Sequence, residues 1–171
     1  ELVQRHIGDS DLLHNWASTL SGAGFNERLA GHLTGSIDLV ARVTNPGEPE
    51  RYVVCDYKTN RVAPPGVMPT IDMFHPQRLA QPMAEAHYPL QALLYSVALH
   101  RYLRWRMRDY DPHVNLGGVG YLFVRGMIGS GTPTVDGVPH GVFEWHPPVE
   151  LITELSDLLD GALDRTSVGV K

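Results

Sequence analysis

The pattern of apolar and polar positions predicts a mixed α/β protein. Residues 31–43 and 51–57 are apolar runs separated by the turn-forming stretch 45–50, so they predict an antiparallel hairpin. Residues 117–127 predict a third strand, and residues 141–146 predict a short edge strand. Between these strands, helical spacing returns.

Three helices are predicted from that spacing. Residues 76–87 form a short one interrupted by Pro82, and residues 88–110 form a long one with Pro89 in its first turn. Residues 147–164 predict an amphipathic helix. Two antiparallel strands, a helix, a strand and a helix make a mixed α/β layer, which we assign to one domain over residues 1–171.

The remaining segments carry weaker patterns. Residues 1–7 suggest a short strand, and residues 9–20 have an acidic cap and helical spacing. Residues 61–77 predict a loop with four prolines, and loops of this length are usually functional or disordered. Residues 131–141 predict a flexible connection.

The second strand of the predicted hairpin carries a charged pair, Asp56 and Lys58, near its end. Alternate side chains on a strand share a face, so Asp56 and Lys58 point the same way as Val54. Both faces are apolar, which predicts a strand buried on both sides. Buried charges must be paired or bound to a metal. For this pair alone, a salt bridge at the strand end is the simplest interpretation.

A second acid, Asp38, lies in the first strand of the hairpin, so the pairing can bring it close to Asp56. Two carboxylates without a cation would repel and raise each other's pKa. A hard divalent cation removes this conflict, and oxygen ligands suit Mg²⁺. Lys58 could then hold or deprotonate a bound water, or stabilise charge on a phosphate. We expect substitution of Asp56 or Lys58 to abolish such chemistry with little loss of fold.

The long helix adds polar and basic positions. Gln91 and Tyr95 stand on one helical face and, on spacing alone, read as a half-buried polar edge. Arg101, Arg104 and Arg108 follow, with aromatic residues between them. Most such arginines are a solvated helix face, but this is the only basic cluster dense enough to neutralise a phosphate backbone.

Composition narrows the functional classes. The chain has 171 residues, 43% hydrophobic and 19% charged, with a net charge of −5 and a pI near 6.0, so any nucleic-acid contact must be local. The single cysteine, Cys55, excludes an internal disulfide and indicates a reducing compartment, which predicts a cytoplasmic protein. No apolar run is long enough to span a membrane. The first residue is Glu1, from which we expect a fragment or a processed product.

Four stretches together resemble a known family: "GHLTGSIDLV", "YVVCDYKTN", "YPLQALLYSVALHRYLRWRMRDYD" and "GGVGYLFVRGM". They are similar to the C-terminal nuclease domain of RecB subunits, which belongs to the PD-(D/E)xK nuclease superfamily. The likeness runs from about residue 31 to residue 127, extends weakly through the last helix and is faint over the first thirty residues. It implies a restriction-endonuclease-like core.

The resemblance also implies roles for individual residues. Asp38, Asp56 and the carbonyl of Tyr57 would bind Mg²⁺, for which Mn²⁺ or Ca²⁺ can substitute in binding. Lys58 would be the catalytic lysine, and Gln91 and Tyr95 would support the site and the DNA strand. The implied partners are DNA, RecC- and RecD-type subunits and the RecA recombinase.

In one respect the chain departs from the family. RecB-type nucleases take a further metal ligand, a histidine, from a helix well upstream of the first acid. His6, His14 and His32 precede Asp38 here, but none matches that element. His32 lies roughly 20 Å from Asp38 along an extended strand at ~3.3 Å per residue, too far for a shared ion. The other histidines, without a motif, are predicted to be surface or helix-cap residues.

Three hypotheses follow. The first is a Mg²⁺-dependent nuclease domain that hydrolyses single-stranded DNA, and the second is a docking module for RecA. The third is a DNA-binding module whose site is idle. Because the upstream ligand is missing, we expect this chain to fold but to bind Mg²⁺ poorly and to cleave slowly or not at all.

Overall fold

The computed structural model describes residues 1–20 and 34–160. Its main sheet has four strands in the order β1-β2-β3-β6. The strands are β1 (Leu39–Val43), β2 (Arg51–Lys58), β3 (Leu116–Phe123) and β6 (Val142–Trp145). A separate two-stranded hairpin is made by β4 (Thr134–Val135) and β5 (Val138–Pro139).

Helices fill the connections between the strands. The α-helices are α1 (Leu2–His6), α2 (His14–Thr19), α3 (Ala80–Glu85), α4 (Tyr88–Arg106), α5 (Pro112–Asn115) and α6 (Val149–Leu159). Three short 3₁₀ helices are η1 (Ile71–Phe74), η2 (Pro76–Leu79) and η3 (Val124–Gly126). The three predicted helices are all present, the first of them as η2 followed by α3. The predicted acidic cap of α2 is wrong, because the N-cap residue is Leu13; Asp11 lies before it and its Oδ1 accepts a hydrogen bond from the Leu13 N–H at 2.7 Å.

The pairing of the sheet combines a hairpin with a crossover. β1 and β2 are antiparallel, with Leu39 opposite Cys55, as the turn-forming stretch predicts. β2 and β3 are parallel, and the chain between them passes through α4. β6 pairs antiparallel with β3 and is one of the two edge strands of the sheet. The predicted mixed sheet with flanking helices is thereby confirmed.

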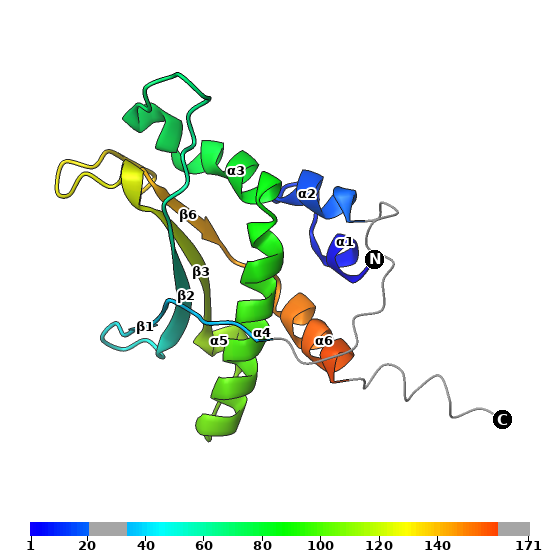
Figure 1. Ribbon diagram of the computed structural model, residues 1–171. Helices are drawn as coiled ribbons and strands as arrows, with labels where there is room; N and C mark the ends of the chain where they lie inside the picture. Colours follow the sequence, from blue (N-terminus) through cyan, green and yellow to red (C-terminus); the bar gives the residue numbers. More distant parts are fainter. Residues whose placement is uncertain (21–33, 161–171) are drawn as a thin grey trace.

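The helices gather on one face of this sheet. Figure 1 shows α4 running along that face, with α6 beyond it. The buried apolar side chains that join sheet and helices include Val54, Val119, Tyr121, Phe123, Leu93 and Phe74. Gly126 lies against this core so closely that an added Cβ would stand 2.5 Å from Phe74, a contact that only glycine can avoid.

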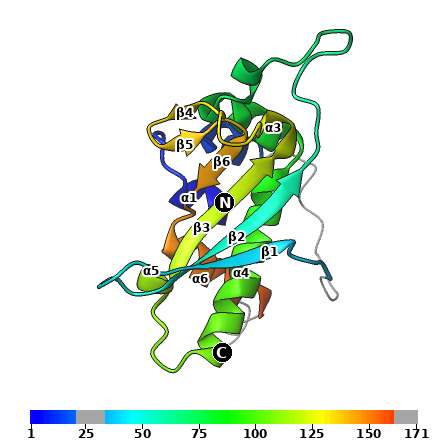
Figure 2. The same ribbon diagram turned by 90° about the vertical axis from the view of Figure 1, so that its left-hand side faces the viewer.

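Figure 2 looks onto the opposite face of the sheet, which no helix of the described residues covers. On β2 this face carries Val53 and Cys55, which are half-buried, and Tyr57, whose exposed fraction is 50%. The predicted alternation of faces is correct. The prediction that β2 is buried on both sides is wrong, because helices pack on one face alone.

Two sequence-based boundaries also change. Residues 2–6 are helix α1 rather than a strand, and its C-terminal neighbour Ile7 is buried in the core. The predicted strand 31–43 shortens to Leu39–Val43, so Asp38 lies in a bend just before β1 and not within a strand. Residues 31–33 lie outside the described residues.

Candidate active site

The Asp56–Lys58 pair lies at the end of β2 on the helix-covered face. The Lys58 Nζ stands 2.6 Å from the Asp56 Oδ2, and the two side chains are only 10% and 5% exposed. Such a buried pair requires further hydrogen-bond partners to offset its desolvation. Lys58 finds one on α4, where it donates to the Gln91 Oε1 at 3.0 Å. The pair is therefore integrated into the core.

Gln91 continues the contact into a chain of hydrogen bonds. Its Nε2 donates to the Tyr95 hydroxyl at 3.0 Å, and that hydroxyl donates to the Ser36 carbonyl at 2.7 Å. Ser36 lies two residues before Asp38, so the chain of contacts ties the segment that carries the first acid to the lysine that follows the second. The structure thus brings Gln91 and Tyr95 together with Lys58, as their common helical face allows.

Asp38 lies near the same end of β2, in the bend just before β1. The β1–β2 register ends with Leu39 opposite Cys55, and Asp38 directly precedes Leu39 as Asp56 directly follows Cys55. The Asp38 Oδ2 accepts a hydrogen bond from the Tyr57 backbone N–H at 3.0 Å, while its side chain stays exposed. An exposed and a buried carboxylate therefore lie near the same end of β2.

Two tyrosines that the sequence analysis did not single out surround Lys58. Its Nζ lies 3.8 Å from the ring centroid of Tyr88 and 5.1 Å from that of Tyr121. The Tyr121 hydroxyl is within hydrogen-bond distance of the Tyr88 carbonyl (3.1 Å) and of the Gln91 Oε1 (3.2 Å). Burial, and after it the charge of Asp56, raises the pKa of Tyr121, so this hydroxyl stays protonated and donates. The one feature of the sequence that could have pointed to Tyr121 is its position on the inward-facing side of β3.

The donor set suits a hard cation. Asp38 and Asp56 each use Oδ2 in a protein contact, and within the described residues neither Oδ1 has a hydrogen-bond partner. Carboxylate oxygens are ligands that Mg²⁺ prefers. No three His, Cys, Asp or Glu side chains gather into a metal-binding group in residues 1–20 and 34–160. Asp38 and Asp56 are thus the two side chains of this site that could hold such an ion.

The histidines have other partners. The His6 Nε2 lies 3.2 Å from Glu154 on α6, and the His14 Nδ1 lies 3.6 Å from Asp9. His32 is outside the described residues. His75 caps η2 as predicted. His100 and His140 are buried, which corrects their assignment to the surface.

The predicted basic cluster divides into two parts. Arg101 joins α4 to α6, because its guanidinium donates to the Ser156 Oγ at 3.0 Å and pairs with Asp160 at 2.7 Å. Arg104 and Arg108 are exposed and form no ion pair with any residue in the described ranges. Their predicted contact with DNA stays a prediction, and for Arg101 it would require exchange of its present partners.

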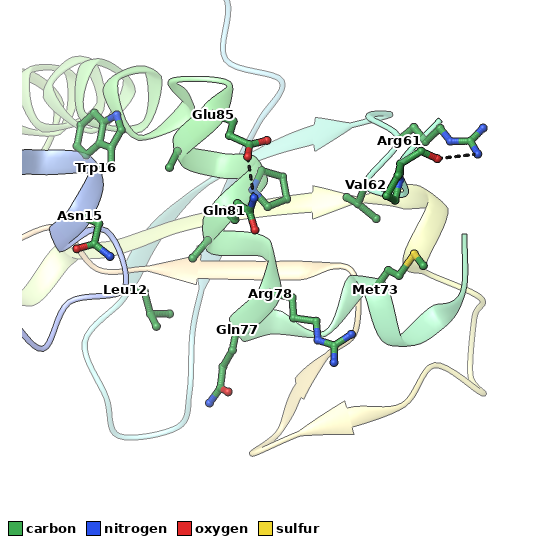
Figure 3. Close-up of a pocket in the computed structure, with 14 residues that line it drawn as sticks. Leu12, Asn15, Trp16, Arg61, Val62, Met73, Gln77, Arg78, Gln81 and Glu85 are labelled. Carbon is green, nitrogen blue, oxygen red and sulfur yellow. Dashed lines mark hydrogen bonds between the residues drawn. The ribbon is translucent and has the colours of Figure 1, made fainter. Parts of the chain in front are cut away.

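A cavity of about 850 Å³ lies elsewhere in the described part of the chain. Figure 3 shows its lining, which comes from α2, the segment after β2 and the η2–α3 region. Trp16, Met73, Arg78 and Glu85 are among the residues that line it, and neither Asp56 nor Lys58 does. We place the candidate site at the strand end because the charged groups converge there, whereas the cavity has no comparable cluster.

The mixed sheet with an Asp–Lys pair at a strand end is compatible with a nuclease-like core. The chain is 50% identical over 161 residues, 94% of its length, to the RecBCD enzyme subunit RecB of Mycobacterium tuberculosis. The corresponding identity is 48% over 161 residues for RecB of Mycolicibacterium smegmatis and 34% over 134 residues for RecB of Escherichia coli. These matches show that the chain is a RecB-type sequence, as the resemblance predicts.

The chain spans 14% of the length of the two mycobacterial relatives and 10% of the length of the Escherichia coli protein. No family model matches the chain. No helix in the described ranges combines the length and the hydropathy that a membrane crossing requires.

Proposed function

We propose that this chain is a Mg²⁺-dependent nuclease domain of a RecB-type subunit, acting in recombination and double-strand-break repair alongside RecC- and RecD-type subunits. The observation that carries the proposal is that Asp38 accepts a hydrogen bond from the backbone N–H of Tyr57, the residue between the paired Asp56 and Lys58. The likeness to RecB over 94% of the chain supports it.

Each residue has a role in this proposal. Asp38, Asp56 and the Tyr57 carbonyl hold the cation, which when bound supplies a nucleophilic water and stabilises charge on the scissile phosphate. Lys58 presents its ammonium to the developing negative charge. Gln91 fixes the lysine from α4, and Tyr95 fixes the segment before Asp38.

The DNA would extend from the site toward the far end of α4. Arg104 lies roughly 20 Å from Gln91 along the helix axis at ~1.5 Å per residue, so it would contact a phosphate several nucleotides away. Because phosphate contacts are electrostatic, each would contribute to the salt dependence of binding.

Cleavage of end-labelled single-stranded DNA tests the proposal. We expect Mg²⁺-dependent products, slow in this chain, that disappear in Asp38→Asn. Asp136→Asn, in the exposed β4–β5 turn, is the matched control, and asparagine tolerates the positive φ of that residue. If Asp38→Asn cleaves at the rate of Asp136→Asn, the site assignment is wrong.

A docking module is the second candidate, favoured by the sheet face that no described helix covers. Apolar sheet surface of this kind is commonly an interaction site. RecA is the partner that the family resemblance implies. Retention of RecA by the wild-type chain, and its loss in Tyr57→Lys on that face, would support this function. Equal retention by both would refute docking at this face.

A further inference from the structure

The ammonium of Lys58 rests on an aromatic ring. Tyr88 is the nearer of the two rings around it, with 3.8 Å from Nζ to the ring centroid. A lysine ammonium within about 6 Å of an aromatic centroid is attracted by the negative face of the ring. Nζ has three N–H donors, of which Asp56 and Gln91 account for two. The Tyr88 ring takes the place of a third acceptor.

The Tyr88 ring is itself held from two sides. Its hydroxyl donates to the Asn60 Oδ1 at 2.9 Å, and its ring stacks on Tyr121 with centroids 5.8 Å apart. Asn60 belongs to the "DYKTN" stretch, yet none of the roles above uses its side chain. The backbone before it is also fixed, because the Arg125 Nε donates to the Thr59 carbonyl at 2.8 Å.

We propose that Tyr88 is a positioning residue for Lys58: its ring, oriented by Asn60, is the seat that fixes the ammonium beside Asp56. Loss of the ring would leave Nζ with two partners and freedom to rotate away from the strand end. The effect of the seat on cleavage rests on the nuclease function proposed above. The contact between the Tyr88 ring and the Lys58 ammonium does not depend on that function.

The chain offers a direct probe of this contact. Its only lysines are Lys58 and Lys171, so isotope-labelled lysine gives two sets of ε-methylene NMR signals. Lys171→Arg assigns them. Protons above an aromatic face are shielded, so we expect the Lys58 signals to lie upfield in the wild type. Tyr88→Phe, which keeps the ring but loses the hydroxyl held by Asn60, should reduce that shielding in part, and Tyr88→Leu should lose it.

Two further variants complete the set. Asn60→Ala removes the acceptor but leaves both rings, so it should reduce the shielding without a large fall in melting temperature. It keeps the test open if Tyr88→Leu does not fold. Tyr102→Leu is the matched control, because Tyr102 is exposed on the same helix, far from Lys58 along its axis. It should leave the Lys58 signals unchanged.

The rate of DNA cleavage measures what the loss of the contact between Tyr88 and Lys58 does to catalysis. A cation–π contact of the usual strength corresponds to a change of about threefold to thirtyfold in rate. We expect Tyr88→Leu to lower kcat by about tenfold, with the KM for DNA within about twofold, and Tyr88→Phe and Asn60→Ala each to lower it by less.

The outcomes separate the two claims. If the wild type does not cleave in Mg²⁺ or Mn²⁺, the proposed function fails for this chain. The shielding of the Lys58 signals still tests whether the Tyr88 ring holds the ammonium. Lys58 signals that are unshielded in the wild type, or unchanged in both Tyr88→Leu and Asn60→Ala, overturn the seat. Shielding lost with an unchanged kcat would show that Tyr88 has no positioning role.

Discussion

Removing one member of the Asp56–Lys58 pair should destabilise the protein as well as inactivate it. The two side chains are 5% and 10% exposed and lie 2.6 Å apart, so Asp56→Ala leaves a buried ammonium without its counter-ion. Breaking a buried pair from one side typically costs about 3–5 kcal/mol. Lys58 keeps Gln91 and the Tyr88 ring, and repulsion between Asp38 and Asp56 is relieved. We therefore expect about 3 kcal/mol.

This burial changes the expectation drawn from the sequence, in which either residue could be replaced with little loss of fold. For a chain of this size, 1 kcal/mol shifts the melting temperature by about 2–4 °C, so Asp56→Ala should melt roughly 6–12 °C lower. Lys58→Met should show a similar loss. The double variant Asp56→Leu/Lys58→Met removes both charges and should cost much less than the sum of the single changes.

Thermal melting by circular dichroism and urea unfolding, both without divalent cations, measure these differences. Arg42→Met is the matched control, because Arg42 pairs with Glu50 at 3.5 Å with its side chain 64% exposed. Its effect should be within about 1 kcal/mol. Single variants that melt within about 2 °C of the wild type would refute the reasoning. A double variant whose cost equals the sum of the two would refute it equally.

Three other measurements test other parts of the structure. Calorimetric titration of Mg²⁺ or Mn²⁺ should give affinity about 10–100-fold weaker for this chain than for one extended toward the N-terminus, by analogy with the cost of lost metal-site contacts; equal affinities would show the upstream histidine to be dispensable. Neutral substitutions of Arg104 and Arg108 should each reduce the salt slope of DNA binding by about one unit, and an unchanged slope would return them to a solvated helix face. Burial, and then the charge of Arg104, lowers the pKa of His100 below its ordinary value of 6.5. Protonation therefore favours the unfolded chain, and stability should fall as the pH drops below about 6.5; His100→Gln should flatten that part of the profile.

Periodicity predicted much of the fold because the elements that build it are long or strongly apolar. The helix α4 buries a series of side chains from Pro89 to Leu103, and the strand β3 buries Val119, Tyr121 and Phe123. Residues 1–7 were predicted wrongly, since seven residues fit either a helical or an extended period and tertiary contacts decide. Asp38 was placed within the strand because the apolar run extends past the point where pairing with β2 begins.

The site was predictable as far as local sequence reaches. Asp56 and Lys58 share a face by alternation alone, and the hairpin brings in Asp38. The rings around Lys58 were not predictable, because Tyr88 and Tyr121 come from a helix and a strand that meet only through the crossover. The burial of the pair also depends on α4 covering one sheet face, which spacing along a strand does not reveal.

The crossover between β2 and β3 sets an order of events during folding. The acidic half of the site belongs to a hairpin, and hairpins form in about 1–10 μs. The basic half depends on the contact between Lys58 and Gln91, which are 33 positions apart, and on parallel pairing over a still longer loop. Contacts of such separation form later because their loop-closure entropy is larger. Two carboxylates should therefore meet before the lysine is fixed beside them, so a divalent cation present during refolding would encounter the acids first and would favour the early hairpin.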